Sequence, residues 1–303
     1  MEQNFETCLY NVVDAAKVQK DELMKKHTTF RIGGPADYFI MPSNEKELEE
    51  TIRVCREFSI PIYIVGNGSN LLVGDKGFRG AIIQLYKSMG TFQVEGNQIT
   101  AQAGCSLAQI ANAALDAALT GFEFAAGIPG TLGGAVVMNA GAYGGEMKDV
   151  LESVTALTGE GKIIELGRNE LELGYRTSVI AKKGYIVLGA VLKLERGDGE
   201  KIKTYMDELK EKRVTKQPLE YPSAGSTFKR PEGYFAGKLI EDAGLRGFQV
   251  GGAQVSEKHC GFVINRDHAT AADIMELMRQ VQIRVKENSG VDLEPEVKRL
   301  GDE

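Results

Sequence analysis

The sequence predicts an α+β fold that is weighted toward strands and divided into two domains. Short strand-like runs and helical patterns are mixed along the first two-thirds of the chain. After Arg196 the composition changes, because the turn-like run 197–200 leads into a helical segment rich in both signs of charge. We therefore place the domain boundary there, with residues 1–196 in one domain and residues 197–303 in a smaller one.

The first predicted helix spans residues 44–58. Asn44 is its first residue and Glu47 follows three residues later, which is the spacing of a capping box, and apolar residues recur on one helical face. A strand at 60–65 follows at once and runs into the polar loop 66–70. The pattern predicts a strand that ends in a tight turn.

A second helix is predicted at 107–119, with Ser106 and Gln109 as its capping pair. Short apolar runs around it predict further strands. These strands are expected at 81–85, 98–103, 150–157 and 185–194.

The smaller domain is predicted to contain three helices and an apolar strand. The last helix, 271–287, is long, and Thr270 with Asp273 forms its expected capping pair. The other elements are expected at 201–216, 236–243 and 261–265.

The composition excludes some classes of partner. Asp and Glu number 42 against 36 Lys and Arg, so the formal net charge is −6. A field of this sign repels nucleic acid and anionic membranes, so we expect neither as a partner. An anionic ligand must therefore be held by local basic residues.

The cysteines and the first residues indicate the cell compartment. Cys8, Cys55, Cys105 and Cys260 are far apart and show no spacing typical of a metal site, so we expect reduced thiols and no metal. Residues 1–4 are polar and do not resemble a secretory signal, and no apolar run approaches 18 residues. We expect a cytoplasmic protein that is a monomer.

Two glycine-rich segments are candidates for cofactor binding. The loop 66–70 has small residues whose N–H groups can face an anion, but it lacks the third glycine of a dinucleotide-binding fingerprint, which disfavours a Rossmann fold. The segment 127–146 is much richer in glycine. A flat cofactor packed against bare main chain explains this segment better than a set of tight turns does.

Six segments together resemble the UDP-N-acetylenolpyruvoylglucosamine reductase family, in the order and rough spacing that the family shows. They cover nearly the whole chain, which makes the resemblance highly specific. The segments are His27-Thr-Thr-Phe-Arg-Ile-Gly-Gly-Pro-Ala-Asp37, Gly66-Asn-Gly-Ser-Asn70, 127–146, Tyr175-Arg-Thr-Ser178, Tyr221-Pro-Ser-Ala-Gly-Ser-Thr-Phe-Lys-Arg-Pro231 and Glu294-Pro-Glu-Val-Lys-Arg299.

The resemblance implies an FAD-binding module of the vanillyl-alcohol-oxidase type, followed by a smaller α+β substrate domain. The module would have two lobes, about 1–75 and 76–196, with the FAD between them, and NADPH would be the electron donor. The resemblance places the following residues at the cofactor: Arg31, Gly66, Asn67, Gly68, Ser69, Asn70, Gly127, Ile128, Pro129, Gly130, Thr131, Gly133, Gly134, Asn139, Ala140 and Gly141.

Arg176, Ser226 and Glu296 match the catalytic positions of the family. Hydride addition to the enol ether pushes negative charge onto the substrate carboxylate, and a guanidinium such as that of Arg176 stabilises this charge. Glu296 is then expected to be either protonated or paired with Arg176. Ser226 keeps its hydroxyl proton at physiological pH and is expected to protonate the α-carbon.

Other positions in the matching segments have weaker assignments. Lys229 and Arg230 are expected to bind the diphosphate of a UDP-sugar substrate, whereas His259 and Asn265 are expected to be structural. The short stretch between Arg176 and Ser226 resembles the members that lack an inserted tyrosine loop.

Two alternatives remain open from the sequence. The chain could be an FAD oxidase that acts on a hydroxyl substrate with O₂, or a nucleotide-sugar binding protein without activity. Rapid reoxidation in air with an alcohol as the only donor indicates the first, and failure to bind FAD indicates the second.

Overall fold

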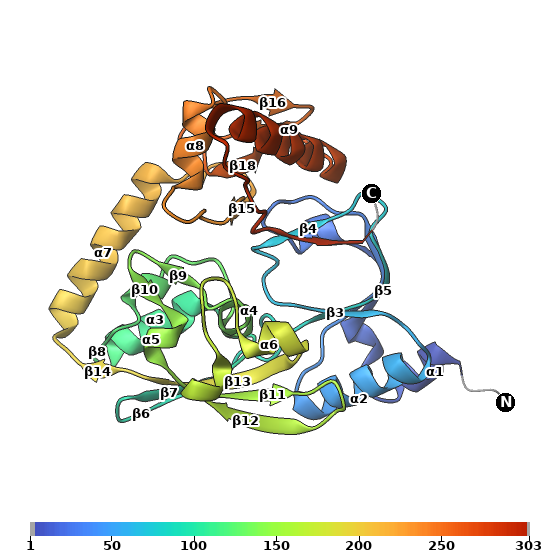
Figure 1. Cartoon of the computed structure of the whole chain (residues 1–303). Helices are drawn as coiled ribbons and strands as arrows, with labels where there is room; N and C mark the ends of the chain where they lie inside the picture. The colour runs from blue at the N-terminus through green and yellow to red at the C-terminus, as the bar shows by residue number, and fades with distance from the viewer. Residues whose placement is uncertain (1–3, 302–303) are drawn as a thin grey trace. The chain divides into compact units, whose positions relative to one another are not determined.

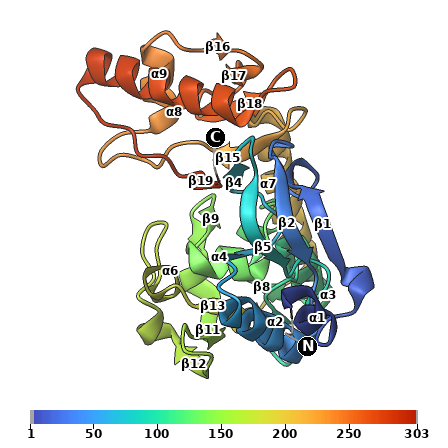
Figure 2. The same cartoon turned by 90° about the vertical axis from the view of Figure 1, so that its right-hand side faces the viewer.

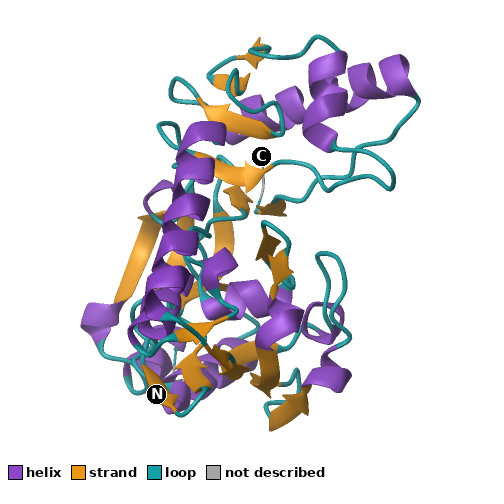
Figure 3. Cartoon of the chain, turned by 90° about the vertical axis from the view of Figure 1, so that its left-hand side faces the viewer, coloured by secondary structure: helices purple, strands orange, loops and turns teal. Residues whose placement is uncertain are grey.

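The computed structural model describes residues 4–301 and divides the chain into two compact units. Unit 1 comprises the chain up to Gln19, Phe39–Asn67 and Ala81–Lys212, and unit 2 comprises Lys20–Tyr38, Gly68–Gly80 and the chain from Arg213 onward. Helices and strands are mixed in both (Figures 1 and 3), as expected for an α+β fold. Residues 1–3, part of the predicted polar N-terminus, lie outside the described residues.

A five-stranded sheet forms the centre of unit 1. Its order is β12-β11-β13-β7-β6 and every neighbouring pair is antiparallel. α4 contacts β13 and β7. The strands are β6 (Phe92–Glu95), β7 (Gln98–Gln102), β11 (Leu151–Leu157), β12 (Ile163–Gly167) and β13 (Ile186–Lys193).

Short elements surround this sheet in unit 1. The helices are α1 (Phe5–Tyr10), α2 (Glu45–Glu57), α3 (Leu107–Asp116), α4 (Leu132–Val137), α5 (Met147–Val150) and α6 (Val179–Lys183), with 3₁₀ turns η1 (Ala15–Lys17), η3 (Glu123–Ala125) and η4 (Arg168–Leu171). Two small antiparallel pairs are β8 (Leu119–Thr120) with β14 (Glu195–Arg196) and β9 (Gly141–Ala142) with β10 (Gly145–Glu146).

A second sheet has the order β1-β2-β5-β3. The division between the two units falls within β1, β2 and β5, so these strands continue from one unit into the other. β3 and β5 pair in parallel. The bounds are β1 (Val18–Leu23), β2 (Pro35–Ile40), β3 (Ile62–Val65) and β5 (Phe78–Gln84), with η2 (Met24–Lys26) after β1.

Unit 2 is built on a sheet of order β15-β18-β17-β16. α9 packs along β16, β17 and β18, and α8 packs against α9 (Figures 1 and 2). A pair of parallel strands, β4 with β19, completes the unit. The bounds are β4 (Leu71–Val73), β15 (Ser223–Ser226), α8 (Ala236–Asp242), β16 (Gln249–Val250), β17 (Ala253–Val255), β18 (Phe262–Asn265), α9 (Ala271–Ser289) and β19 (Lys298–Leu300).

One apolar core joins these parts of unit 2. Phe30, Leu72 and Val297, which come from three distant parts of the sequence, belong to the same buried cluster as the inner face of α9. Asp75 adds a polar link, because its carboxylate accepts hydrogen bonds from the Ala271 and Ala272 N–H groups at 2.9 and 3.1 Å. The residues after β4 are therefore fixed to the first turn of α9.

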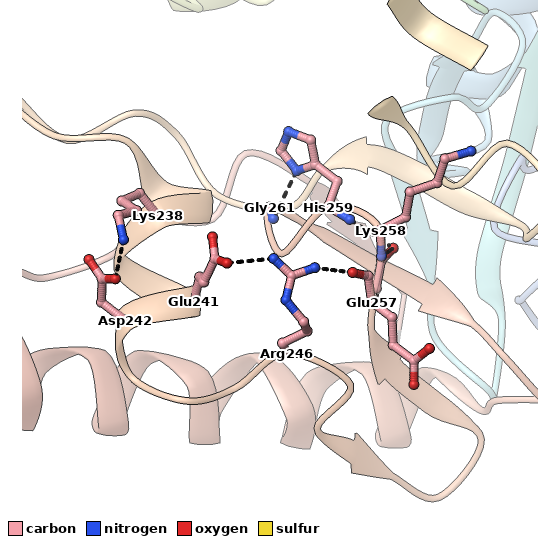
Figure 4. A network of polar contacts seen from close by, with 9 residues as sticks. Lys238, Glu241, Asp242, Arg246, Glu257, Lys258, His259 and Gly261 are labelled. Atoms are coloured by element: carbon pink, nitrogen blue, oxygen red, sulfur yellow. Dashed lines mark hydrogen bonds and ion pairs between the residues drawn. The ribbon is translucent and has the colours of Figure 1, made fainter. Parts of the chain in front are cut away.

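Arg246 supports the loop between β17 and β18 (Figure 4). Its guanidinium donates to the Glu241 carboxylate of α8 at 2.6 Å and to the Glu257 carbonyl. His259, in the same loop, accepts a hydrogen bond from the Gly261 N–H at 3.1 Å through Nδ1. This loop provides the Gly261 carbonyl that binds the main chain next to Ser226.

The predicted boundary at 196/197 is not where the compact units divide. The chain passes between the units within α7 (Gly199–Lys216), after Lys212, and it also does so at several earlier points. A division into contiguous FAD-binding and substrate-binding domains remains a prediction. α7 begins at Gly199, so the turn-like run 197–200 ends two residues earlier than the sequence indicates.

Candidate active site

Ser226 lies at the end of β15, beside a bulge. Ser223 and Ser226 pair with Ile264 and Phe262 of β18, and the register shifts between the two pairs. Gly225 occupies the shift with φ +75°, a conformation that glycine adopts readily. The Ser226 side chain is exposed, whereas the next residue, Thr227, is buried.

Thr227 anchors this part of the chain. Its N–H donates to the Gly261 carbonyl at 2.9 Å, and its Oγ1 accepts a hydrogen bond from the Val263 N–H at 2.9 Å. Since its N–H is bonded to the residue before β18 and its hydroxyl to a residue of β18, Thr227 fixes the position from which Ser226 projects.

Glu296 pairs with Thr227, the residue after Ser226, because two distant segments lie side by side. The Glu296 N–H donates to the Thr227 carbonyl at 2.8 Å, and Phe228 forms a bridge with Pro295. The Glu296 side chain is only 8% exposed. Two of the three predicted catalytic residues, separated by 70 positions in the sequence, are therefore neighbours in unit 2.

Asn70, the last residue of the predicted pyrophosphate loop, joins the same cluster. Its Nδ2 donates to the Glu296 carbonyl at 3.2 Å, and its own carbonyl accepts from the Lys298 N–H at 3.0 Å. Gly68 packs so closely on the preceding segment that a Cβ there would lie 2.1 Å from the His27 carbonyl oxygen. The residues 68–70 are thus held against both His27 and Glu296.

The remaining predicted residues of unit 2 have different surroundings. Arg31 is exposed and has φ +55°. Lys229 forms an ion pair with Glu294, and the Arg230 guanidinium lies 4.4 Å from the centre of the Phe235 ring. Both cations therefore have partners within the protein.

The first half of the loop 66–70 packs on the glycine-rich segment within unit 1. Asn67 Nδ2 donates to the Pro129 carbonyl at 2.7 Å. A Cβ on Gly66 would lie 2.2 Å from Thr131 Oγ1, and a Cβ on Gly133 would lie 2.9 Å from the Ala103 Cβ. Contacts within the protein are sufficient to explain these two glycines.

Gly134 is different. It lies in the first turn of α4, it is exposed, and the nearest atom to an added Cβ is Thr131 Oγ1 at 3.7 Å. An alanine fits there and is intrinsically favoured in a helix by roughly 1 kcal/mol. The protein's own packing therefore does not require a glycine at this position. A ligand that lies directly on the main chain of α4 would require one, because any side chain would occupy the same space. The segment fits a flat cofactor at this point.

The end of the glycine-rich segment is tied to the turn that carries Arg176. Asn139 is buried and its side chain donates to the Gly174 carbonyl at 3.0 Å. The Ala140 carbonyl accepts from the Met147 N–H, and Gly141 pairs with Glu146 in the β9–β10 hairpin. These contacts are all within unit 1.

The predicted site residues are thus shared between the two units. Unit 1 contains Gly66, Asn67, Gly127, Ile128, Pro129, Gly130, Thr131, Gly133, Gly134, Asn139, Ala140, Gly141 and Arg176. Unit 2 contains Arg31, Gly68, Ser69, Asn70, Ser226, Lys229, Arg230 and Glu296.

The residues expected to be structural have structural contacts. Asn265 Oδ1 accepts from the Ala269 N–H at 2.8 Å, and its Nδ2 donates to the Phe30 carbonyl at 3.1 Å. Burial lowers the pKa of His259. Burial also raises the pKa of Cys55 to about 12 and of Cys105 to about 11, so these thiols stay protonated and unreactive.

The sequence reasoning did not identify Thr227 and Asp75 as supports of the site. Thr227 follows Ser226 directly, but a single threonine gives no signal of its own that its hydroxyl is buried and bonded to a distant strand. Asp75 gives no local signal, because the helix that it caps begins almost 200 residues later.

Among residues 4–301 there is no group of three His, Cys, Asp or Glu side chains that could hold a metal ion. No helix in the same range is long and apolar enough to cross a membrane.

Comparisons with known proteins agree on one family. The family model for the C-terminal domain of UDP-N-acetylenolpyruvoylglucosamine reductase matches residues 217–300, and the model for an FAD-binding domain matches residues 36–167. A UDP-N-acetylenolpyruvoylglucosamine reductase from Agathobacter rectalis is 53% identical, with all of both chains covered. The reductase from Lachnoclostridium phytofermentans is 54% identical over 97% of this chain and 96% of that protein.

Solved structures give the same result. The crystal structure of UDP-N-acetylenolpyruvylglucosamine reductase (MurB) from Thermus caldophilus superposes with a TM-score of 0.81 at 37% identity, covering 94% of this chain and 99% of that one. An alkyldihydroxyacetonephosphate synthase, at 17% identity and a TM-score of 0.50 over 64% of this chain and 41% of that one, shares the fold alone. The fold is thus an FAD-binding module of the vanillyl-alcohol-oxidase type with a smaller α+β domain, and the chain belongs to the UDP-N-acetylenolpyruvoylglucosamine reductase family of flavoprotein oxidoreductases.

Proposed function

We propose that this protein uses NADPH to reduce the enolpyruvyl group of UDP-N-acetylenolpyruvoylglucosamine, forming UDP-N-acetylmuramate for peptidoglycan precursor synthesis in the cytoplasm. Relatives with this reductase name match almost the full length of the chain. When bound, FAD supplies the hydride transfer between NADPH and the substrate carbon.

The role of the glycine-rich segment is to let a ligand reach the main chain. We assign the FAD ring to the side of α4 on which Gly134 leaves open space. Asn67 and Pro129, which are bonded to each other, join the pyrophosphate loop to this wall within unit 1. The residues at the wall thus bind and orient the cofactor rather than react.

The substrate carboxylate requires a cation and the α-carbon requires a proton. Once hydride has added to the β-carbon, negative charge builds up on the α-carbon and on its carboxylate. We assign Arg176 to that carboxylate, because a guanidinium forms two parallel bonds with it. Ser226 then gives its hydroxyl proton to the α-carbon, and solvent returns a proton to the serine.

The observation that supports these roles most is the pairing of Glu296 with Thr227. It brings the main chain of the buried residue Glu296 to the residue after the exposed Ser226, and Asn70 of the predicted pyrophosphate loop bonds to the same glutamate's carbonyl. The segments that carry the predicted proton donor, the predicted catalytic glutamate and the end of the predicted pyrophosphate loop are therefore bonded to one another, which supports the proposed roles.

The test is stopped-flow measurement of the two half-reactions of the FAD-loaded protein without oxygen. In Ser226→Ala, bleaching of the flavin by NADPH should proceed nearly as before, since the hydroxyl has no role in that step. Recovery of the flavin absorbance on adding the enolpyruvyl substrate should slow by roughly 10²–10⁴-fold, the effect of losing a positioned general acid. Ser226→Cys should restore part of the rate.

Ser223→Ala is the matched control, because Ser223 lies on the same strand and bonds through its main-chain carbonyl to Thr29. It should leave both half-reactions unchanged. If Ser226→Ala slows both half-reactions equally, or neither, Ser226 is a packing residue and the assignment of the proton donor is wrong.

A further inference from the structure

The turn that carries Arg176 is small and strained. Gly174 and Thr177 exchange two main-chain hydrogen bonds, at 3.1 and 3.3 Å, so that Tyr175 and Arg176 alone form its tip. Arg176 has φ +54°, which is uncommon for a residue with a long side chain. Such a conformation persists only where the surrounding structure imposes it.

Both ends of this turn are fixed to the glycine-rich segment. Asn139 Nδ2 donates to the Gly174 carbonyl at 3.0 Å at one end. At the other end Ser178, which is fully buried and caps α6, donates from Oγ to the Val137 carbonyl at 2.6 Å. Val137 and Asn139, to which the turn is bonded, are only two residues apart, so they hold both ends of the turn in a fixed position.

Asn139 is itself held in a single orientation. Its Oδ1 accepts a hydrogen bond from the Lys148 N–H at 2.8 Å, and its Nδ2 also donates to the Glu146 carboxylate at 2.5 Å. The side chain is 1% exposed. Since the amide must present its oxygen to a donor and its nitrogen to two acceptors, neither a rotated amide nor an aspartate satisfies all three contacts.

From this geometry we infer that Asn139 is a positioning residue, which sets Arg176 relative to the segment that holds the FAD. Its side-chain bonds are all made to the protein, so only its main chain remains for contact with the cofactor. The inference depends on the proposed function, because it assigns to Arg176 the substrate carboxylate. It extends that proposal by naming the residue that links the glycine-rich segment, to which we assign the flavin, with the Arg176 guanidinium.

The test uses Asn139→Gly in the FAD-loaded protein. Glycine accepts the φ of +44° at this position, so the variant removes the three side-chain bonds without backbone strain. We expect FAD content and the rate of reduction by NADPH to stay within about twofold, and the limiting rate of the substrate half-reaction to fall about tenfold or more, as for loss of an interaction made in the transition state. Glu146→Gln is the matched control, because its amide oxygen can still accept from Asn139 and the bond to Gly174 stays; it should leave both rates unchanged.

A double-mutant cycle with Arg176→Ala separates positioning from general stability. If Asn139 acts through Arg176, Asn139→Gly should have no further effect once the arginine is gone. Equal effects in both backgrounds overturn the inference. If Arg176→Ala alone leaves the substrate half-reaction intact, the proposed role of Arg176 fails instead, and the two failures are distinguishable.

Hydrogen exchange gives a measure that does not depend on activity. In Asn139→Gly the amides of residues 172–180 should exchange faster, with or without FAD, while those of β11 and β13 keep their protection. Unchanged exchange at 172–180 overturns the inference. If Asn139→Gly does not yield folded protein, Asn139→Asp takes its place, because it keeps the acceptor for Lys148 but loses both donors, and the same results are expected.

Discussion

Lys229 and Arg230 are neighbours with different partners. The ammonium group of Lys229 is paired with Glu294, which reduces the charge that it offers to a ligand, whereas the Arg230 guanidinium lies over the Phe235 ring. The diphosphate role predicted for Lys229 therefore depends on whether Glu294 releases its ammonium group.

We predict that the double variant Lys229→Ala, Arg230→Ala raises KM for the UDP-substrate about tenfold or more, with little change in reduction by NADPH. The charges act on ground-state binding, which changes KM before the chemical step. Glu294→Gln should shift KM in the opposite direction, because it releases Lys229. Steady-state kinetics in low salt measures both.

Lys286→Ala is the control for this prediction, since it removes an exposed cation that is paired with Asp292 in the same unit. Its KM should not change. An unchanged KM in the double variant would show that Lys229 and Arg230 are part of a solvated turn.

Single-residue backbone conformations were outside what the sequence could predict. Arg31, Asn139 and Arg176 were expected at the site, and each has a positive φ in the structure. Asn adopts this region fairly readily, but Arg rarely does, so its conformation comes from the surrounding contacts rather than from its own preference. The amino-acid composition of the segment therefore does not predict the positive φ of these arginines.

At the scale of single elements, helix starts were the most predictable feature. The capping residues Asn44, Ser106 and Thr270 were each predicted, and each accepts a hydrogen bond from an N–H group in the first turn. A cap is a contact over three residues, so the local sequence is enough to determine it.

The segment 127–146 was less predictable. It was interpreted as bare main chain that packs against a flat cofactor, and no element was assigned to it, but the structure has a helix, α4, and the β9–β10 hairpin there. Glycine lowers helix propensity, so the composition of this glycine-rich segment did not predict α4. Tertiary contacts to β7 and β13 stabilise this short helix instead.

Gly134→Ala tests whether this glycine serves a ligand. In the FAD-free protein the free energy of unfolding should rise by up to about 1 kcal/mol, because alanine is favoured in a helix and nothing in the protein obstructs it. The affinity for FAD should fall at least about tenfold, because the methyl group occupies space that we assign to the ring. Denaturant unfolding and fluorescence titration with FAD measure the two effects.

Gly199→Ala is the matched control, as Gly199 begins α7 and an added Cβ meets nothing within 4 Å. It should raise stability without changing FAD affinity. Full FAD affinity in Gly134→Ala would mean that the cofactor does not lie on this side of α4.

At the scale of the whole molecule, the important contacts are non-local. The bonds from Glu296 to Thr227 and from Lys298 to Asn70 join residues that are 69 and 228 positions apart. Periodicity and capping cannot predict such pairs, because the patterns extend over only a few residues. The family resemblance predicted Asn70, Ser226 and Glu296 at one site, and the structure pairs Glu296 with Thr227, the residue after Ser226.

The division of the chain also depends on non-local contacts. A composition change after Arg196 indicated two contiguous domains, whereas each compact unit is made of three separate stretches. Residues 20–38 and 68–80 pack with the C-terminal part because their apolar side chains, such as Phe30 and Leu72, belong to its core. A linear scan of composition cannot detect such an exchange.

One titration of the purified, FAD-loaded protein, followed by visible absorption without oxygen, shows whether it is an NADPH-dependent reductase of the enolpyruvyl substrate. We predict that one equivalent of NADPH bleaches the flavin bands and that one equivalent of UDP-N-acetylenolpyruvoylglucosamine restores them, with UDP-N-acetylmuramate as the product. Recovery of the bands only on admitting O₂, with the enolpyruvyl substrate unchanged, would contradict the account.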